Sequence, residues 1–238
     1  MIRRAREEDV DAAARIYEAL MDREEAGQGA TNWKRGVYPT RETARRAQEA
    51  GWLYVKEDGA GGICASMILN HEQPPCYRDA DWQVAAAPEN VLVLHTLCVD
   101  PACAGRGIGR EMVRFALSHA RETGMRAVRL DTYEGNAPAR ALYAGLGFRL
   151  VGRADVLHEG VIPETLVLFK RGIKRNGKKA RERHGSRAFW VLGKGLGGGR
   201  CERMPQRASG SSGRRREGKR EGLSNRRRFS PRVSGIPR

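Results

Sequence analysis

The sequence reads VLVLHTLCV at residues 91–99, DPACAGRGIG at residues 100–109 and REMVRFALSHARET at residues 110–123. The first segment is almost entirely apolar, which is typical of a buried strand. In the third segment apolar residues recur at helical spacing, so we expect a helix over residues 107–123. Three glycines (Gly105, Gly107 and Gly109) lie in the turn between them. The stretch therefore predicts a strand, a glycine-rich turn and a helix in succession.

This succession predicts an anion-binding site. The first backbone N–H groups of a helix have no partner inside the helix, and the helix dipole adds positive potential there. Glycines allow the backbone to close around a phosphate. The dinucleotide fingerprint G-x-G-x-x-G fails because Arg110, Glu111 and Met112 follow Gly109, and no G-K-[ST] completes a Walker A motif. We therefore expect a phosphate-bearing cofactor of another kind.

A second motif, NAPARALYAGLGF at residues 136–148, begins 27 residues after Gly109. The turn AGRGIG resembles the [RQ]-x-x-G-x-[GA] acetyl-CoA loop of the GCN5-related N-acetyltransferase (GNAT) family, except that Ala104 stands where the family usually has Arg or Gln. The second motif is similar to the family pattern N-x-x-A-x-x-L-Y-x-x-x-G-F at every named position. The resemblance covers roughly residues 2–169 and is strongest over residues 91–148.

Strands and helices interleave on both sides of this centre. We expect strands at residues 2–5, 52–56, 63–69, 91–99, 127–131, 148–151 and 164–169, and helices at residues 8–21, 40–50, 107–123 and 137–146. This order predicts an α/β or α+β fold with a mixed sheet. The resemblance implies the GNAT fold, with a central mixed, mostly antiparallel sheet of six to seven strands flanked by about four helices.

The resemblance also implies roles for particular residues. Those expected to hold acetyl-CoA, the acyl donor, are Leu97, Cys98, Val99, Gly105, Arg106, Gly107, Ile108, Gly109, Arg110, Asn136 and Tyr143. A splayed strand at residues 97–99 would offer a backbone N–H to the thioester carbonyl. The Tyr143 hydroxyl would protonate the departing thiolate. Asn136 precedes a helix, so we also expect it to cap that helix.

Several residues are candidates for the base that removes the amine proton. His95 lies on the strand before the glycine turn, where family members often place a Glu or His, and it is our first candidate. Glu134, His71 and Glu72 remain alternatives, and His95 also has a reading as a satisfied strand histidine or a pocket wall.

Strand alternation gives a further expectation about this segment. It places His95 in phase with Leu97 and Val99 and out of phase with Leu94 and Cys98. We therefore expect the Cys98 side chain to point away from His95 and into packing, which argues against a covalent acyl-cysteine route.

The resemblance implies an acetyl-CoA-dependent N-acetyltransferase that acts by direct attack of a primary amine. Trp33, Tyr38 and Trp82 lie in loops, where exposed aromatic residues often line binding pockets. In family members the loop between the first two helices and the loop before the cofactor strand border the acceptor site, so the resemblance implies that residues 31–38 and 71–82 form walls facing the acceptor. The acceptor, a small molecule or a peptide amine, stays open. Two alternatives also stay open: a catalytically weak CoA-binding regulator on the same fold, and a nucleic-acid-associated protein acting through a basic tail.

Charge divides the chain into two regions. Residues 171–238 hold 22 Lys and Arg against 4 Asp and Glu, whereas residues 1–170 hold 22 against 24. The second region also contains 13 of the 29 glycines. Such composition favours disorder, because it buries too little apolar surface to offset chain entropy. We expect a GNAT acetyltransferase domain at residues 1–170 and a basic, disordered tail at residues 171–238, with nonspecific polyanion binding by the tail.

The composition also bears on where the protein is located and on whether it needs a metal. No apolar run approaches a membrane span, and the N-terminus does not resemble a secretory signal. The five cysteines form no C-x-x-C pair, and the histidines lack H-E-x-x-H spacing. We therefore expect a cytoplasmic protein that needs no metal and binds no membrane; the sequence leaves a homodimer open.

Overall fold

The computed structural model describes residues 1–78, 80–82, 86–174 and 201–203. The strands are β1 (Ile2–Arg4), β2 (Leu53–Glu57), β3 (Ile63–Asn70), β4 (Val91–Val99), β5 (Ala127–Tyr133), β6 (Arg149–His158), β7 (Ile162–Gly172) and β8 (Cys201–Arg203). The helices are α1 (Val10–Glu25), α2 (Arg41–Glu49), α3 (Ile108–Glu122) and α4 (Ala137–Gly145), with 3-10 turns η1 (Glu7–Asp9), η2 (Pro75–Tyr77), η3 (Pro88–Asn90) and η4 (Pro101–Cys103).

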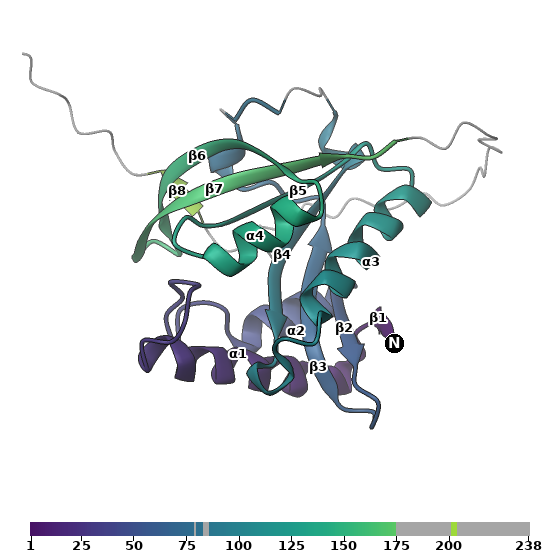
Figure 1. Ribbon diagram of the computed structural model, residues 1–238, viewed down its shortest axis with the longest axis vertical. Coiled ribbons are helices and arrows are strands. Elements are labelled where there is room, and N and C mark those ends of the chain that lie inside the picture. The colour runs from purple at the N-terminus through teal and green to yellow at the C-terminus, as the bar shows by residue number, and fades with distance from the viewer. Residues whose placement is uncertain (79, 83–85, 175–200, 204–238) are drawn as a thin grey trace, which may run out of the picture. The chain divides into compact units, whose positions relative to one another are not determined.

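Among the described residues the strands form one mixed sheet in the order β1-β2-β3-β4-β5-β7-β6-β8. Every neighbouring pair is antiparallel except β4 and β5. This parallel pair is short, because only residues 91–93 of β4 pair with residues 127–129 of β5. Beyond that point the two halves of the sheet diverge, as Figure 1 shows.

The local sequence explains where the helices begin. The Thr40 hydroxyl accepts a hydrogen bond from the Thr43 backbone N–H and caps α2. Asn136 Oδ1 accepts from the Ala139 N–H at 3.1 Å and caps α4, an interaction worth about 1 kcal/mol. The capping role expected for Asn136 is therefore confirmed, and it fixes α4 directly after β5.

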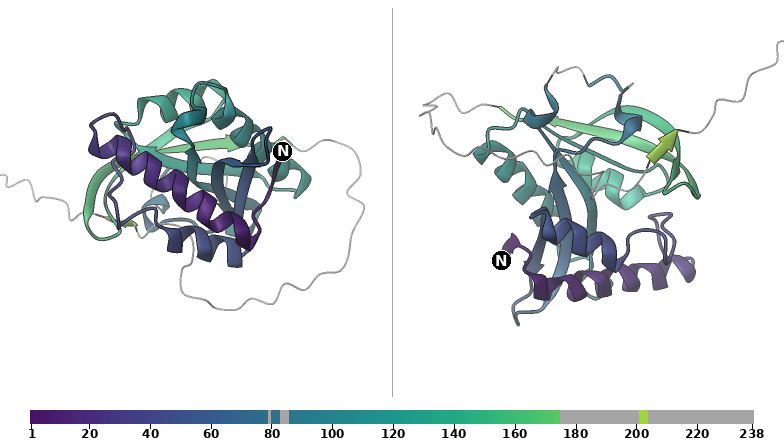
Figure 2. Two further views of the ribbon diagram at one scale, coloured as in Figure 1. Left: turned by 90° about the horizontal axis from the view of Figure 1, so that it is seen from below. Right: turned by 180° about the vertical axis from the view of Figure 1, so that it is seen from behind.

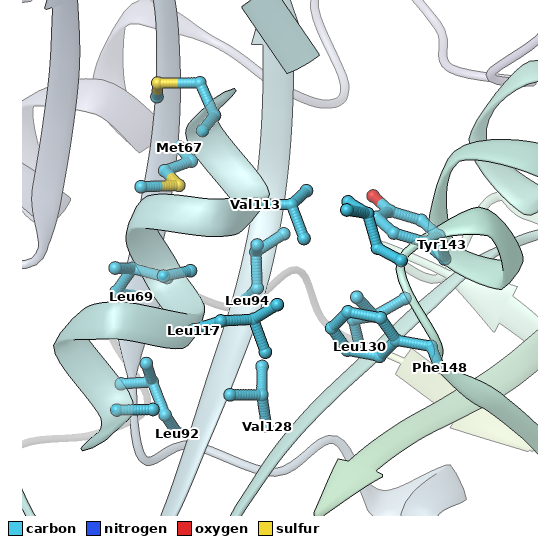
Figure 3. Packing of buried hydrophobic residues seen from close by; sticks show 14 of the residues in the cluster. Met67, Leu69, Leu92, Leu94, Val113, Leu117, Val128, Leu130, Tyr143 and Phe148 are labelled. Atoms are coloured by element: carbon cyan, nitrogen blue, oxygen red, sulfur yellow. The ribbon is translucent and has the colours of Figure 1, made fainter. Parts of the chain in front are cut away.

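Helices cover both faces of the sheet. Helices α3 and α4 pack on one face, where Val113 and Leu117 of α3 meet Leu94, Val128 and Leu130 in a buried cluster (Figure 3). Helices α1 and α2 cover the other face of β2, β3 and β4 (Figure 2). On the face opposite α4, the segment around η2 packs against residues of β4, β6 and β7. Both faces of the sheet are thus covered near the point where β4 and β5 diverge.

The C-terminal strands are longer than the sequence predicts. A β-hairpin joins β6 and β7 over residues expected in part to be a loop. Strand β7 continues to Gly172, beyond the domain boundary expected at residue 170. Residues 201–203 of the expected tail pair with β6, so the described sheet has eight strands, seven of them within residues 1–172. The rest of the expected disordered tail, residues 175–200 and 204–238, lies outside the described residues.

Within the described ranges, no helix has the length and hydrophobicity that a bilayer span requires.

Candidate active site

The glycine turn forms an open cradle at the start of α3. Gly107 is the N-cap residue, and its φ of 76° is left-handed. A Cβ added at Gly105 or Gly107 would meet no atom within 4 Å, so the space beside this backbone is open. No side chain caps the helix, so the first N–H groups of α3 remain available to an anion. The side chains of Arg106 and Arg110 are exposed beside the cradle.

Gly109 brings this cradle close to α4. A Cβ at Gly109 would lie 3.4 Å from Leu142 Cδ2 and 3.8 Å from Val99 Cγ2. The third glycine therefore serves close packing between α3, β4 and α4. A pyrophosphate at the cradle would lie next to the end of β4 and the helix that carries Tyr143. These residues fit the diphosphate of a CoA molecule.

Strand β4 contains a bulge just before its end. Ile68 of β3 pairs with His95, but Ser66 pairs with Cys98, so three steps along β4 match two along β3. The extra residue bends the strand. Thr96 lies at the bulge with a φ of 49°, which is unusual for a β-branched residue. Its hydroxyl is hydrogen-bonded to the Tyr38 hydroxyl.

The bulge reverses the expected alternation. Leu94 lies on the α3 and α4 face, and Leu97 and Val99 pack against the same cluster. His95 and Cys98 both lie on the opposite face. The expectation that His95 is in phase with Leu97 and Val99, and out of phase with Cys98, is therefore wrong, because the extra residue shifts the two-residue period by one.

A pocket of about 100 Å³ lies where β4 and β5 part. Its lining includes four residues expected for the site: His95, Leu97, Asn136 and Tyr143. The remaining lining residues come from the loop before α2, the loop after β3, strands β4 to β7 and helix α4; they are Thr31, Trp33, Tyr38, Pro74, Leu94, Thr96, Asp131, Thr132, Tyr133, Ala139, His158, Glu164 and Leu166. The pocket joins α4 on one side to the β6–β7 hairpin on the other.

Comparison with known proteins assigns this arrangement to a family. The profile of the Acetyltransferase (GNAT) family matches residues 13–148, more than half of the chain. The chain belongs to the GNAT family. The match spans the divergent strands, the glycine cradle and α4.

Curated relatives of this GNAT protein match it over short segments. The mycothiol acetyltransferase of Segniliparus rotundus is 42% identical over 55 residues, which make up 23% of this chain and 21% of that protein. The N-alpha-acetyltransferase RimI of Mycobacterium tuberculosis is 46% identical over 59 residues, 25% of this chain and 35% of RimI. The chain thus spans less than half the length of these relatives.

The same fold is found in solved structures. The yncA structure from Salmonella typhimurium, solved with its cofactor acetyl-CoA, is 19% identical to this GNAT protein. It has a TM-score of 0.53, and the match covers 76% of this chain and 98% of that chain. At this identity the likeness shows a shared GNAT fold.

Tyr143 of this GNAT protein is held by aromatic packing. Its ring lies 5.8 Å from that of Phe148 and 5.9 Å from that of Phe169. Figure 3 shows it on α4 beside Leu130. Burial raises the pKa of the Tyr143 hydroxyl, and nearby Asp131 raises it further. The hydroxyl therefore stays protonated at neutral pH and can donate a proton into the pocket.

Cys98 does not share this environment. Its side chain is 1% exposed and packs in the cluster with α1 and α2. Burial raises the pKa of the thiol, which keeps it neutral and unreactive as a nucleophile. Of the residues expected to contact acetyl-CoA, Cys98 thus offers its backbone rather than its side chain.

His95 is buried and engaged by two acceptors. Its Nε2 lies 3.0 Å from Asn70 Oδ1 and 3.2 Å from the Glu72 carbonyl oxygen. Both partners accept, so Nε2 carries the hydrogen. Burial lowers the pKa of His95 to about 4. This geometry matches the reading of a satisfied strand histidine that also forms part of a pocket wall.

The buried state of His95 makes the protein less stable in acid. Because His95 titrates near pH 4 when folded and near 6.5 when unfolded, the unfolded chain binds its proton first. The free energy of unfolding should fall by about 3 kcal/mol as the pH drops from about 6.5 to 4. Urea unfolding over this range should show a smaller loss in His95→Gln, whose amide can still donate to Asn70. Equal pH dependence in both proteins would contradict this.

The other expected bases lie outside the pocket lining. Glu134 Oε1 forms an exposed ion pair with Arg153 Nε at 2.6 Å. His71 Nδ1 lies 2.7 Å from the Val91 carbonyl oxygen at the start of β4. Glu72 contributes its backbone carbonyl to His95. The structure therefore does not bring these three side chains together with Tyr143.

The two expected acceptor walls take different positions. Thr31, Trp33 and Tyr38 of the first wall line the pocket. From the second segment only Pro74 does so among the described residues. Tyr77 instead packs over β5, where its hydroxyl donates to Asp131 Oδ2 at 2.7 Å.

Among the pocket residues that the sequence did not predict, three have an acidic or imidazole side chain. They are Asp131 on β5, His158 on β6 and Glu164 on β7. His158 Nδ1 donates to Glu164 Oε1 at 2.8 Å. The sequence signal that could have found this pair was Gly160 between two apolar segments, because glycine is common in hairpin turns. In the structure Glu159 and Gly160 both have a positive φ in the tight turn between β6 and β7.

Proposed function

We propose that this GNAT protein transfers the acetyl group of acetyl-CoA to a primary amine by direct attack. The observation that carries the proposal is the pocket at the divergence of β4 and β5, which contains the Tyr143 hydroxyl and adjoins the glycine cradle through Gly109. The two ends of the site fit the two reactants, a diphosphate-bearing acyl donor and a small acceptor. The acetyl-CoA in the yncA structure supports the choice of donor.

The chain's own groups have distinct tasks in this reaction. The cradle binds the diphosphate through backbone N–H groups and the dipole of α3. The bulge at Thr96 and the short β4–β5 ladder leave backbone groups of residues 97–99 without pairing to β5. One such N–H stabilises the negative charge that develops on the thioester oxygen. Tyr143 donates a proton to the departing thiolate.

The names of the relatives support an amine acceptor. They include a mycothiol acetyltransferase and an N-alpha-acetyltransferase. For this chain we propose only the class of acceptor, which is a small-molecule or peptide amine. A regulator that binds CoA without turnover is the competing function on this fold.

An acceptor screen tests the proposal. The full chain is incubated with acetyl-CoA and, separately, phenylethylamine, spermidine, glucosamine and a hexapeptide with a free Ala N-terminus. Release of free CoA is followed with a thiol reagent. We expect release above the hydrolysis rate with at least one amine, and an N-acetyl product by mass spectrometry. Binding of acetyl-CoA without release for any amine would favour the regulator.

A further inference from the structure

One wall of the pocket contains an imidazole fixed by a buried carboxylate. The Glu164 side chain is 2% exposed, and its Oε1 lies 2.8 Å from His158 Nδ1. The Tyr38 ring packs against the imidazole with a centroid separation of 4.6 Å. Because the carboxylate takes the Nδ1 hydrogen, Nε2 is the nitrogen that can gain or lose a proton. The pair is held from two sides, by the hairpin and by the loop before α2.

The groups around His158 favour its charged form. Tyr38 faces it from the loop, Asp131 from β5, Glu164 from β7 and Glu159 from the adjoining turn. Burial opposes the charge, but the hydrogen bond and charge of Glu164, with Asp131 and Glu159 nearby, together raise the pKa of His158 above its usual value. A raised pKa makes the neutral imidazole a stronger base, which favours transfer of a proton from an ammonium group.

The pocket is also acidic. Its lining contains the carboxyl groups of Asp131 and Glu164 and, among the described residues, neither Lys nor Arg. An ammonium group entering this pocket meets the Glu164 carboxylate and the carboxyl group of Asp131, whose pKa burial raises against the opposing hydrogen bond from Tyr77. Transfer of the ammonium proton to His158 moves the positive charge within the pocket and leaves the net charge of the pocket unchanged. The carboxylates therefore keep a positive partner throughout the transfer.

On this basis, and resting on the acetyl transfer proposed above, we propose that His158 is the general base of the reaction and that the acceptors are cationic primary amines. Glu164 is a positioning residue that orients the imidazole. Asp131 and Glu164 attract the ammonium form of the acceptor.

His95 is less suited to this task. Its Nε2 hydrogen is committed to Asn70 and Glu72, and burial holds its pKa at about 4. An imidazole with that pKa would have to take a proton from an alkylammonium of pKa about 10, which is an unfavourable transfer by about six orders of magnitude. His158, with its carboxylate partner, lowers that cost.

The ammonium nitrogen gives one proton to His158 Nε2, and the neutral amine attacks the carbonyl carbon of the thioester. The tetrahedral intermediate then loses a second N–H proton to solvent as the C–S bond breaks. The thiolate takes a proton from Tyr143, which is restored by the proton held on His158 or by solvent. The net reaction forms an amide, free CoA and one released proton.

The test is the pH dependence of kcat/KM with the panel amine that releases CoA fastest. The wild-type protein should give a bell-shaped pH profile. The value of kcat/KM rises as His158 loses its proton and falls near pH 10, where the acceptor amine loses its proton. In His158→Gln, kcat/KM should fall by about 10²–10⁴-fold and the rising limb should disappear. In Glu164→Gln, which keeps a hydrogen-bond acceptor but not the charge, the rising limb should move to lower pH. His95→Gln is the matched comparison, and its rising limb should stay in place.

The outcomes separate this proposal from the proposed function. A rising limb that persists unchanged in His158→Gln, or that disappears in His95→Gln, overturns the assignment of the base while acetyl transfer stands. A rate that keeps increasing through pH 10 overturns the cationic acceptor. Absence of CoA release from wild type with every panel amine overturns both proposals. Thermal stabilisation by acetyl-CoA, measured in each variant, shows that the fold and the cradle of that variant are intact. If acetyl-CoA does not stabilise His158→Gln, the shift of the rising limb in Glu164→Gln decides whether His158 is the base.

Discussion

The Gly107→Trp variant is expected to fold and to lose the stabilisation that acetyl-CoA gives to the wild-type protein. A ligand that binds only the folded state at 100 times its Kd adds about 2.7 kcal/mol. For a domain of this size that corresponds to a rise in Tm of about 5–10 °C. An indole at Gly107 would occupy the open space beside the first N–H groups of α3. Differential scanning fluorimetry with and without acetyl-CoA measures the effect.

Gly124→Trp is the matched control. Gly124 follows the other end of α3, has a φ of 77°, and also has no atom within 4 Å of an added Cβ. Both variants therefore carry similar backbone strain, about 1–2 kcal/mol. Only Gly107→Trp should lose the shift. A normal shift in Gly107→Trp would show that the diphosphate binds elsewhere, and loss in both variants would point to general destabilisation.

The Tyr143→Phe variant should lower kcat by about 10²–10⁴-fold, the usual range for removing a general acid. Binding of acetyl-CoA and the Tm should change little, because the ring keeps its contacts with Phe148 and Phe169. Burst-phase and steady-state CoA release measure the chemical step. Because the Tyr143 pKa is raised, wild type should not lose activity through ionisation of this hydroxyl near neutral pH.

Tyr54→Phe serves as the control for that substitution. Tyr54 is buried in the same cluster, but its hydroxyl accepts from Arg4 Nε at 3.2 Å and does not line the pocket. It should retain wild-type turnover. Equal turnover in Tyr143→Phe and wild type would leave Tyr143 with a packing role and assign thiolate protonation to solvent.

Much of the fold could be predicted because local signals agreed with each other. The apolar run at residues 91–99 is β4 with the expected bounds, and the periodic segment after the glycines is α3. Thr40 and Asn136 mark helix starts through their own side chains. The family and fold that the two motifs indicated are confirmed. In each case the decisive information lies within a few residues along the chain.

The features that were missed depend on distant partners or on local exceptions. The bulge at Thr96 interrupts the strict alternation of side chains along β4. Thr96 there has a left-handed backbone conformation, and its hydroxyl is hydrogen-bonded to Tyr38, which lies 58 positions away in the sequence. Gly152 and Pro163 interrupt the strand pattern of the hairpin, so the sequence did not bring His158 and Glu164 together. In the structure His158 pairs with Ile162 and Glu164 with Val156, so the two side chains meet as diagonal neighbours across β6 and β7.

Strand β8 has a consequence for how molecules of this protein meet each other. Without it β6 would be the outer strand of the sheet, and an outer strand is a template for strands of other molecules. The first part of β6 discourages such contact through Arg149, Arg153 and a bulge near Gly152. Its last three residues, Val156, Leu157 and His158, lack these features, and β8 pairs with those three. The short strand therefore covers the part of this edge that has none of these protective features.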